Sequence, residues 1–147
     1  MLVCAGQDAT TSVGAVAPVD VSSANGYAVE ADIQLLRYNP ADGSFGLVVR
    51  VQQNGDGYGF GATTDGTIVL ATHQIGVSPT TLDSKPFNPG SDWHRFRLEV
   101  SGNNLRAFVD GSLALNSTDN TFVAGDSVGL WSSGAQLNIR QFTVTAL

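Results

Sequence analysis

Three polar side chains alternate with apolar ones along one segment of this chain: Glu30, Asp32 and Gln34. Side chains two residues apart in a β-strand point to the same face, so these three share one face. Two carboxyl groups about 5–5.5 Å apart can hydrolyse a glycosidic bond, one as nucleophile and one as acid/base. Gln34 offers neither function, so we interpret this segment as a solvated or ligand-binding strand face.

The sequence contains no other arrangement that predicts catalysis. His73 and His94 are the only histidines, and no Gly-x-Ser-x-Gly motif provides a nucleophile elbow. No cluster of His and Cys has the spacing of a transition-metal site. We therefore predict that the chain is not an enzyme and requires no cofactor. A structural calcium ion is an open alternative, because residues 54–57 and 119–120 offer suitable oxygen ligands.

A second group of residues has the composition of a carbohydrate-binding surface. Sugars are held by aromatic rings that stack on their C–H faces and by planar hydrogen-bonding side chains. Trp131 is out of phase with the apolar Val128 and Leu130, so its ring should point away from the core. The alternative is a ring that covers the edge of a sheet. The predicted ligand-binding residues are Glu30, Asp32, Arg50, Gln52, Arg97 and Trp131.

These residues lie on segments with the two-residue period of β-strands. Residues 27–35, 45–51 and 95–101 each place apolar side chains on one face and polar ones on the other, which is typical of antiparallel sheets with one wet side. Arg50 could pair with Glu30 or Asp32 across neighbouring strands. The pattern predicts an all-β fold of about a dozen short strands: a two-sheet antiparallel β-sandwich.

Turn residues mark where these strands end. Residues 65–66, 102–104 and 110–111 have the composition of hairpin tips. Residues 79–92, with three prolines, are predicted to form the longest loop. The last strand changes phase, since Leu137 and Ile139 are odd-numbered while Phe142 and Val144 are even-numbered. We therefore predict a β-bulge near Arg140 or Gln141.

The bulk composition fits one globular domain, residues 1–147, with 42% hydrophobic and 14% charged residues. A formal net charge of −6 without a basic stripe argues against a nucleic-acid partner. No run is long and apolar enough for membrane insertion. Residues 1–6 are too short for a signal sequence, so we expect Met1 to begin an excised fragment or a mature domain. Residues 1–25 should hold one or two strands, with Cys4 as a small core residue.

The second half of the chain resembles a known fold family. Trp93 opens a strand, a hairpin leads to Val109-Asp110-Gly111, and Gly129-Leu130-Trp131 precedes the last strand. This order is similar to the closing strands of concanavalin A-like jelly rolls of the laminin G-like branch. Residues 46–50 and 57–60 resemble the middle strand pair of the same group, so the likeness extends over about residues 27–147.

The resemblance implies a concanavalin A-like jelly roll but no single function, because the group includes glycan-binding modules, adhesion domains, sensor ectodomains and glycosidases. Glu30, Asp32 and Gln34 look like the catalytic strand of family 16 glucanases, with Gln34 in place of the second Glu.

Our first hypothesis is a non-catalytic recognition module that binds a glycan or polysaccharide, or acts in adhesion, within a larger extracellular or cell-envelope protein. One alternative is a glycoside-processing enzyme of the same fold. The other is a structural or sensory ectodomain with a protein partner, which would present an apolar patch of several hundred Å².

Overall fold

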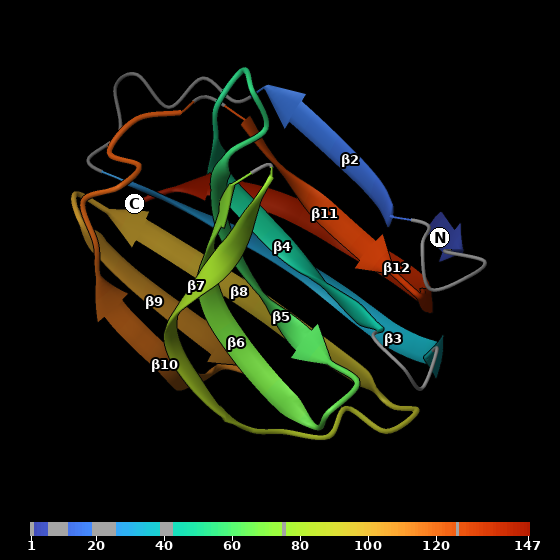
Figure 1. The fold of residues 1–147 in the computed structure, drawn as a ribbon. Helices are drawn as coiled ribbons and strands as arrows, with labels where there is room; N and C mark the ends of the chain where they lie inside the picture. The colour runs from blue at the N-terminus through green and yellow to red at the C-terminus, as the bar shows by residue number, and fades with distance from the viewer. Residues whose placement is uncertain (1, 6–11, 19–25, 39–42, 75, 126) are drawn as a thin grey trace.

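The computed structural model describes residues 2–5, 12–18, 26–38, 43–74, 76–125 and 127–147, and the side chains from residue 26 onward. Twelve strands within these ranges form two sheets of six, and all neighbouring strands are antiparallel. The two sheets lie in separate layers, with the green strands β5 to β7 crossing the yellow and orange strands β8 to β10 (Figure 1). The predicted two-sheet sandwich is confirmed.

We name the two layers sheet A and sheet B. In spatial order, sheet A consists of β1 (Leu2–Ala5), β12 (Ala135–Ala146), β3 (Tyr27–Tyr38), β8 (Trp93–Ser101), β9 (Asn104–Val109) and β10 (Ser112–Thr118). Sheet B consists of β2 (Ser12–Pro18), β11 (Ser127–Ser133), β4 (Ser44–Val51), β5 (Gly57–Thr63), β6 (Thr67–Gln74) and β7 (Val77–Pro86).

The core lies between the sheets and is made by the alternating apolar side chains. Phe45 and Phe60 of sheet B meet Phe96 of sheet A with ring centroids 5.6 and 5.8 Å apart, and all three rings are fully buried. Such contacts add specific geometry to the burial of large apolar surfaces. Because every second residue of a strand faces this core, the residues between them must face outward on either side of the sandwich.

The hairpin predictions are confirmed: tight turns at residues 64–66, 102–103 and 110–111 join β5 to β6, β8 to β9 and β9 to β10. The prediction that residues 79–92 form one loop is wrong. Val77–Pro86 is the edge strand β7, and the loop is limited to residues 87–92. Proline is tolerated at a sheet edge, where a missing N–H breaks no ladder bond, so its presence did not exclude a strand.

The predicted bulge in β12 is also confirmed. Pairing with β3 shifts between Arg140 and Thr143, and Gln141 adopts a φ of 56°. The extra residue returns Val144 to the inner face, where it packs against the core.

The N-terminal segment contributes β1 and β2, in agreement with the prediction of one or two strands there. Cys4 pairs in register with Leu137, but its side chain lies outside the described residues, so its core role stays a prediction. No helix in the described part of the chain has the length and apolarity needed to cross a membrane.

Candidate functional site

The six predicted ligand-binding residues do not form one surface. Glu30, Asp32 and Arg97 lie on the outer face of sheet A, whereas Trp131 lies on the outer face of sheet B. Arg50 and Gln52 stand at the end of β4, between the sheets and the loops that join them. The alternation of apolar and polar residues distinguishes inward from outward side chains. It does not show to which of the two sheets each outward side chain belongs.

The outer face of sheet A carries a continuous line of alternating charges, which we name the charge ladder. Each carboxylate contacts two guanidinium groups: Asp32 lies between Arg140 and Arg95, Glu30 between Arg95 and Arg97, and Glu99 between Arg97 and Arg106. Its members in order are Arg140, Asp32, Arg95, Glu30, Arg97, Glu99 and Arg106. The predicted trio is therefore part of a larger network of paired charges.

Asp32 is the most buried residue of the charge ladder, with an exposure of 6%. Arg95 donates a 2.8 Å hydrogen bond from Nε to its carboxylate, and Arg140 lies 3.3 Å away. The hydrogen bond from Arg95 is the main reason that the pKa of Asp32 is lowered, although burial opposes it. A carboxyl group with a lowered pKa is ionised at neutral pH and is a poor general acid.

Both ends of the charge ladder rest on aromatic rings. The guanidinium carbon of Arg140 lies 4.1 Å from the centre of the Trp93 ring, and that of Arg106 lies 5.2 Å from the centre of the Phe108 ring. These are cation–π distances, so they hold the terminal arginines over the sheet. Trp93 accordingly has one ring face occupied.

Arg50 has a different place from the one predicted. Its side chain is only 7% exposed, and its Nη1 donates to the carbonyl oxygens of Gly102 and Phe122. Its backbone has a φ of 50°, and its N–H donates to the Tyr27 hydroxyl. The predicted outward position is wrong because this left-handed residue turns the end of β4 inward. Pairing with Glu30 or Asp32 is also wrong, since those residues belong to the other sheet.

Gln52 continues this connection. Its side-chain amide donates to the carbonyl oxygens of Arg50 and Ala124. Gln52 therefore links the end of β4 to the segment before β11. From the sequence, Gln52 was predicted only to be an outward polar residue.

Trp131 points away from the core, as predicted. Its neighbours Leu130 and Ser132 are buried, while Trp131 is half-buried on the outer face of sheet B. The indole N–H donates a 3.1 Å hydrogen bond to Ser44 Oγ, which fixes one edge of the ring. No ring or cation among the described residues stacks on Trp131, in contrast to Trp93.

Glycines form the floor beneath the Trp131 ring. A Cβ atom added at Gly46 would lie 2.5 Å from Trp131 Cη2, and one added at Gly61 would lie 2.7 Å from the same atom. At Gly59 the nearest ring atom would be 3.4 Å away. The ring therefore lies against the backbone of β4 and β5, which only residues without side chains permit. This role of the glycines was not predicted, although glycine recurs at every second position of β5 and could have indicated it.

The outward strand positions of sheet B differ from those of sheet A in carrying no charge. Charged residues occur in its six strands only at Arg50, Asp83 and Lys85. Arg50 is turned inward, and Asp83 accepts a hydrogen bond from the backbone N–H of Asn116 in β10. Lys85 is paired in register with the buried Ile68 and so does not belong to the outward set.

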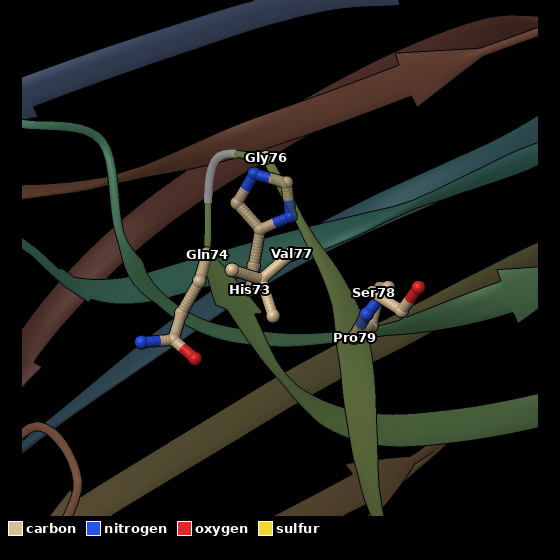
Figure 2. Close-up of a pocket in the computed structure, with 6 residues that line it drawn as sticks. All are labelled: His73, Gln74, Gly76, Val77, Ser78 and Pro79. Atoms are coloured by element: carbon tan, nitrogen blue, oxygen red, sulfur yellow. The ribbon is translucent and has the colours of Figure 1, made fainter.

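A shallow depression lies at the turn between β6 and β7. His73, Gln74, Val77 and Pro79 line it together with Gly76 and Ser78, and their side chains spread around the turn rather than converging on one point (Figure 2). His73 is exposed on β6. The depression offers no aromatic ring and no pair of converging charges.

His94 and Asp110 form a separate polar contact at the opposite end of sheet A from Glu99. His94 Nδ1 lies 2.7 Å from Asp110 Oδ2, and Nε2 lies 2.8 Å from the carbonyl oxygen of Pro89. The contact fastens the 87–92 loop to the turn between β9 and β10, and we assign it a structural role.

The described residues contain no group of three or more His, Cys, Asp or Glu side chains placed to hold a metal ion. In the two loops considered for calcium, Asn54 contacts Asp56, and Asp119 accepts hydrogen bonds from the Tyr58 hydroxyl and the Thr121 N–H. Both carboxylates therefore already have protein partners.

No protein-family model matches this chain, and no curated protein sequence matches it. Solved structures do. Carbohydrate-binding module CBM66 from Bacillus subtilis has a TM-score of 0.72 at 17% identity, and the match covers 90% of this chain and 78% of that chain.

Two galectins are also similar. Sheep galectin-11 has a TM-score of 0.64 at 14% identity, with 90% of this chain and 96% of that chain covered. The Caenorhabditis elegans galectin LEC-6 has a TM-score of 0.65 at 17% identity, with 88% and 89% covered. The laminin G-like branch stays a prediction. At these identities the likeness is one of fold, and the chain is a two-sheet jelly-roll sandwich of the concanavalin A-like type.

Proposed function

We propose that this domain is a non-catalytic carbohydrate-binding module and that Trp131 is its central binding residue. The observation that carries the proposal is the position of the Trp131 ring, which lies over Gly46, Gly59 and Gly61 on the outer face of sheet B. One ring face rests on backbone, while no aromatic or cationic group of the described residues stacks on the other. The likeness of fold to a carbohydrate-binding module and to galectins supports this choice of ligand class.

A ring held in this way suits the recognition of a sugar. The C–H groups on one side of a pyranose or furanose ring form an apolar patch that stacks on an aromatic face. The hydrogen bond to Ser44 and the glycine floor fix the orientation of Trp131 before the ligand arrives. Such preorganisation reduces the entropy that binding must overcome.

The charge ladder of sheet A is the less suitable surface for this role. Its carboxylates and guanidinium groups already pair with each other, and Arg140 covers Trp93. A sugar would have to displace these contacts before making its own. The same pairing argues against catalysis, since Asp32 is held ionised between two arginines and Gln34 donates to the carbonyl oxygen of Ser91.

A glycan array on the purified domain tests the proposal. Trp131→Ala should reduce binding to any hit by at least about tenfold, which corresponds to the loss of one stacking contact. Trp93→Ala is the matched control, because it removes the other tryptophan from the opposite face. Loss of binding in Trp93→Ala with retention in Trp131→Ala would contradict the assigned surface.

We further propose that the domain works in an extracellular or cell-envelope protein, where polysaccharides are displayed. A structural calcium ion bound by loop oxygens stays a prediction, and the array is therefore repeated with a chelator. A blank array under both conditions would reject carbohydrate binding and favour a protein partner.

A further inference from the structure

The outward residues of sheet B form rows that run across the strands, and two neighbouring rows begin at Trp131 and Ser133 of β11. The strand register places Trp131 beside Gly46, then Gly61, Val69 and Ser84. The adjacent row contains hydroxyl side chains, in order Ser133, Ser44, Thr63 and Thr67. Neighbouring strands lie about 4.8 Å apart, so either row extends over roughly 14 Å from β11 to β6.

The two rows have complementary chemistry. The first presents the Trp131 ring, which lies over Gly46 and Gly61, followed by Val69 and Ser84, and the second presents hydroxyl oxygens. A hydroxyl group has one donor and two acceptor positions, so an oxygen that already makes one contact can bind another partner. Ser44 Oγ accepts from the Trp131 indole, and Thr63 Oγ1 bonds to the Asp65 carboxylate.

Charge distribution adds a restriction on the ligand. Four of the seven basic residues belong to the charge ladder on the other side of the sandwich, together with three of the thirteen acidic residues. Ten acidic and three basic residues are left for the rest of the chain. Asp65, at the tip of the β5–β6 hairpin, is the charged group joined to the hydroxyl row, and its pKa is lowered by the hydroxyl groups of Thr63 and Thr67.

An acidic saccharide would therefore find no cation at the outward strand positions of this face and would approach a chain with a net charge of −6. Removing a carboxylate or sulfate from water without a counter-charge is unfavourable. A neutral saccharide has no such cost, and its hydroxyl groups can bond to the hydroxyl row.

From these rows we infer that the Trp131 surface selects neutral glycan chains and binds them across the strands, with one sugar on Trp131 and its neighbours along the hydroxyl row. This inference rests on the proposed function and adds the class of ligand. Binding by stacking and neutral hydrogen bonds should change little with ionic strength, because no opposite charges meet.

The test is a polysaccharide microarray with neutral probes (β-1,3-glucan, β-1,4-glucan, xylan, mannan and galactan) and acidic probes (polygalacturonate, alginate and heparin). The hexose polymer that binds most strongly is also oxidised at its primary alcohols to give a matched acidic form. We expect neutral probes to bind and the oxidised form to bind at least about tenfold more weakly. Raising the salt from about 0.02 to 0.5 M should change neutral binding by less than about twofold.

Variants separate this inference from the proposed function. Ser44→Ala should weaken neutral binding, and Trp131→Ala should weaken it by at least about tenfold, whereas Arg106→Gln on the charge ladder should leave it unchanged. Preferential binding of acidic probes, or a steep salt dependence, with sensitivity to Trp131→Ala would overturn the inference while the proposed function stands. Binding that ignores Trp131→Ala, or no binding to any probe, would overturn both.

Discussion

Trp131 and Gly46 are paired in register across β11 and β4, and the indole lies so close above the glycine that a Cβ there would be 2.5 Å from Cη2. The ring of the one residue thus occupies the space that the side chain of the other would fill. This relationship explains why an outward tryptophan is half-buried rather than fully exposed and has a fixed orientation. It also makes the glycines of β4 and β5 part of the candidate site.

The glycine floor can be tested with two alanine substitutions. A Cβ at Gly61 would clash with the backbone of Phe45, so Gly61→Ala should destabilise the fold by about 1–3 kcal/mol. At Gly59 the added atom would meet Trp131 at 3.4 Å, so Gly59→Ala should keep the fold and shift the ring slightly. Thermal unfolding and tryptophan fluorescence in a Trp93→Phe background measure the two effects. Equal stability of both variants would contradict the close approach.

Arg50 should matter for stability more than for direct ligand contact. Removal of its guanidinium leaves two carbonyl oxygens without their donor: that of Phe122 in a buried hydrogen bond and that of Gly102 in a part-buried one. We expect Arg50→Ala to lower the free energy of unfolding by about 2–4 kcal/mol in urea denaturation. Gln53→Ala, at an exposed neighbouring position, is the control and should have little effect. A fully stable Arg50→Ala variant that fails to bind glycan would instead assign Arg50 to the site.

Asp32 should make stability depend on pH in the acid range. Its pKa is lowered from 3.8 in the folded protein, mainly by the hydrogen bond from Arg95. The stabilisation is therefore present above the pKa of the unfolded chain and is lost as the pH falls through the folded pKa. Asp32→Asn should reduce stability by about 1 kcal/mol at pH 7 and flatten the acid side of the profile. An unchanged acid profile in urea titrations would contradict this role.

The three tyrosines should resist ionisation in the folded protein. Burial raises the pKa of Tyr27 and Tyr38, and burial together with its hydrogen bond to Asp119 raises the pKa of Tyr58 to about 12. Their ordinary value is 10.0, so this stabilisation is present below pH 10.0 and is lost as the pH rises through the folded values. Absorbance at alkaline pH should show tyrosinate only with unfolding. A separate ionisation step near pH 10.0, with the fold intact, would contradict the burial of one of these hydroxyl groups.

The sequence alone determined the fold class. Apolar residues alternate with polar ones at a period of two, and this alternation shows which residues of each strand face the core. The inward Phe45, Phe96 and Leu98 and the bulge near Gln141 followed from that rule. The rule failed at Arg50, whose left-handed backbone interrupts the alternation. It also failed for β7, where prolines suggested a loop.

Only the tertiary structure decided which outward residues lie together. Glu30 and Arg97 are 67 positions apart yet adjacent, because β3 and β8 are neighbours in sheet A. Trp131 faces the opposite direction because β11 belongs to sheet B. An alternating strand has the same pattern in either sheet, so the pattern does not reveal the strand order. Strand order depends on packing between distant segments, and it placed the charge ladder on one face and Trp131 on the other.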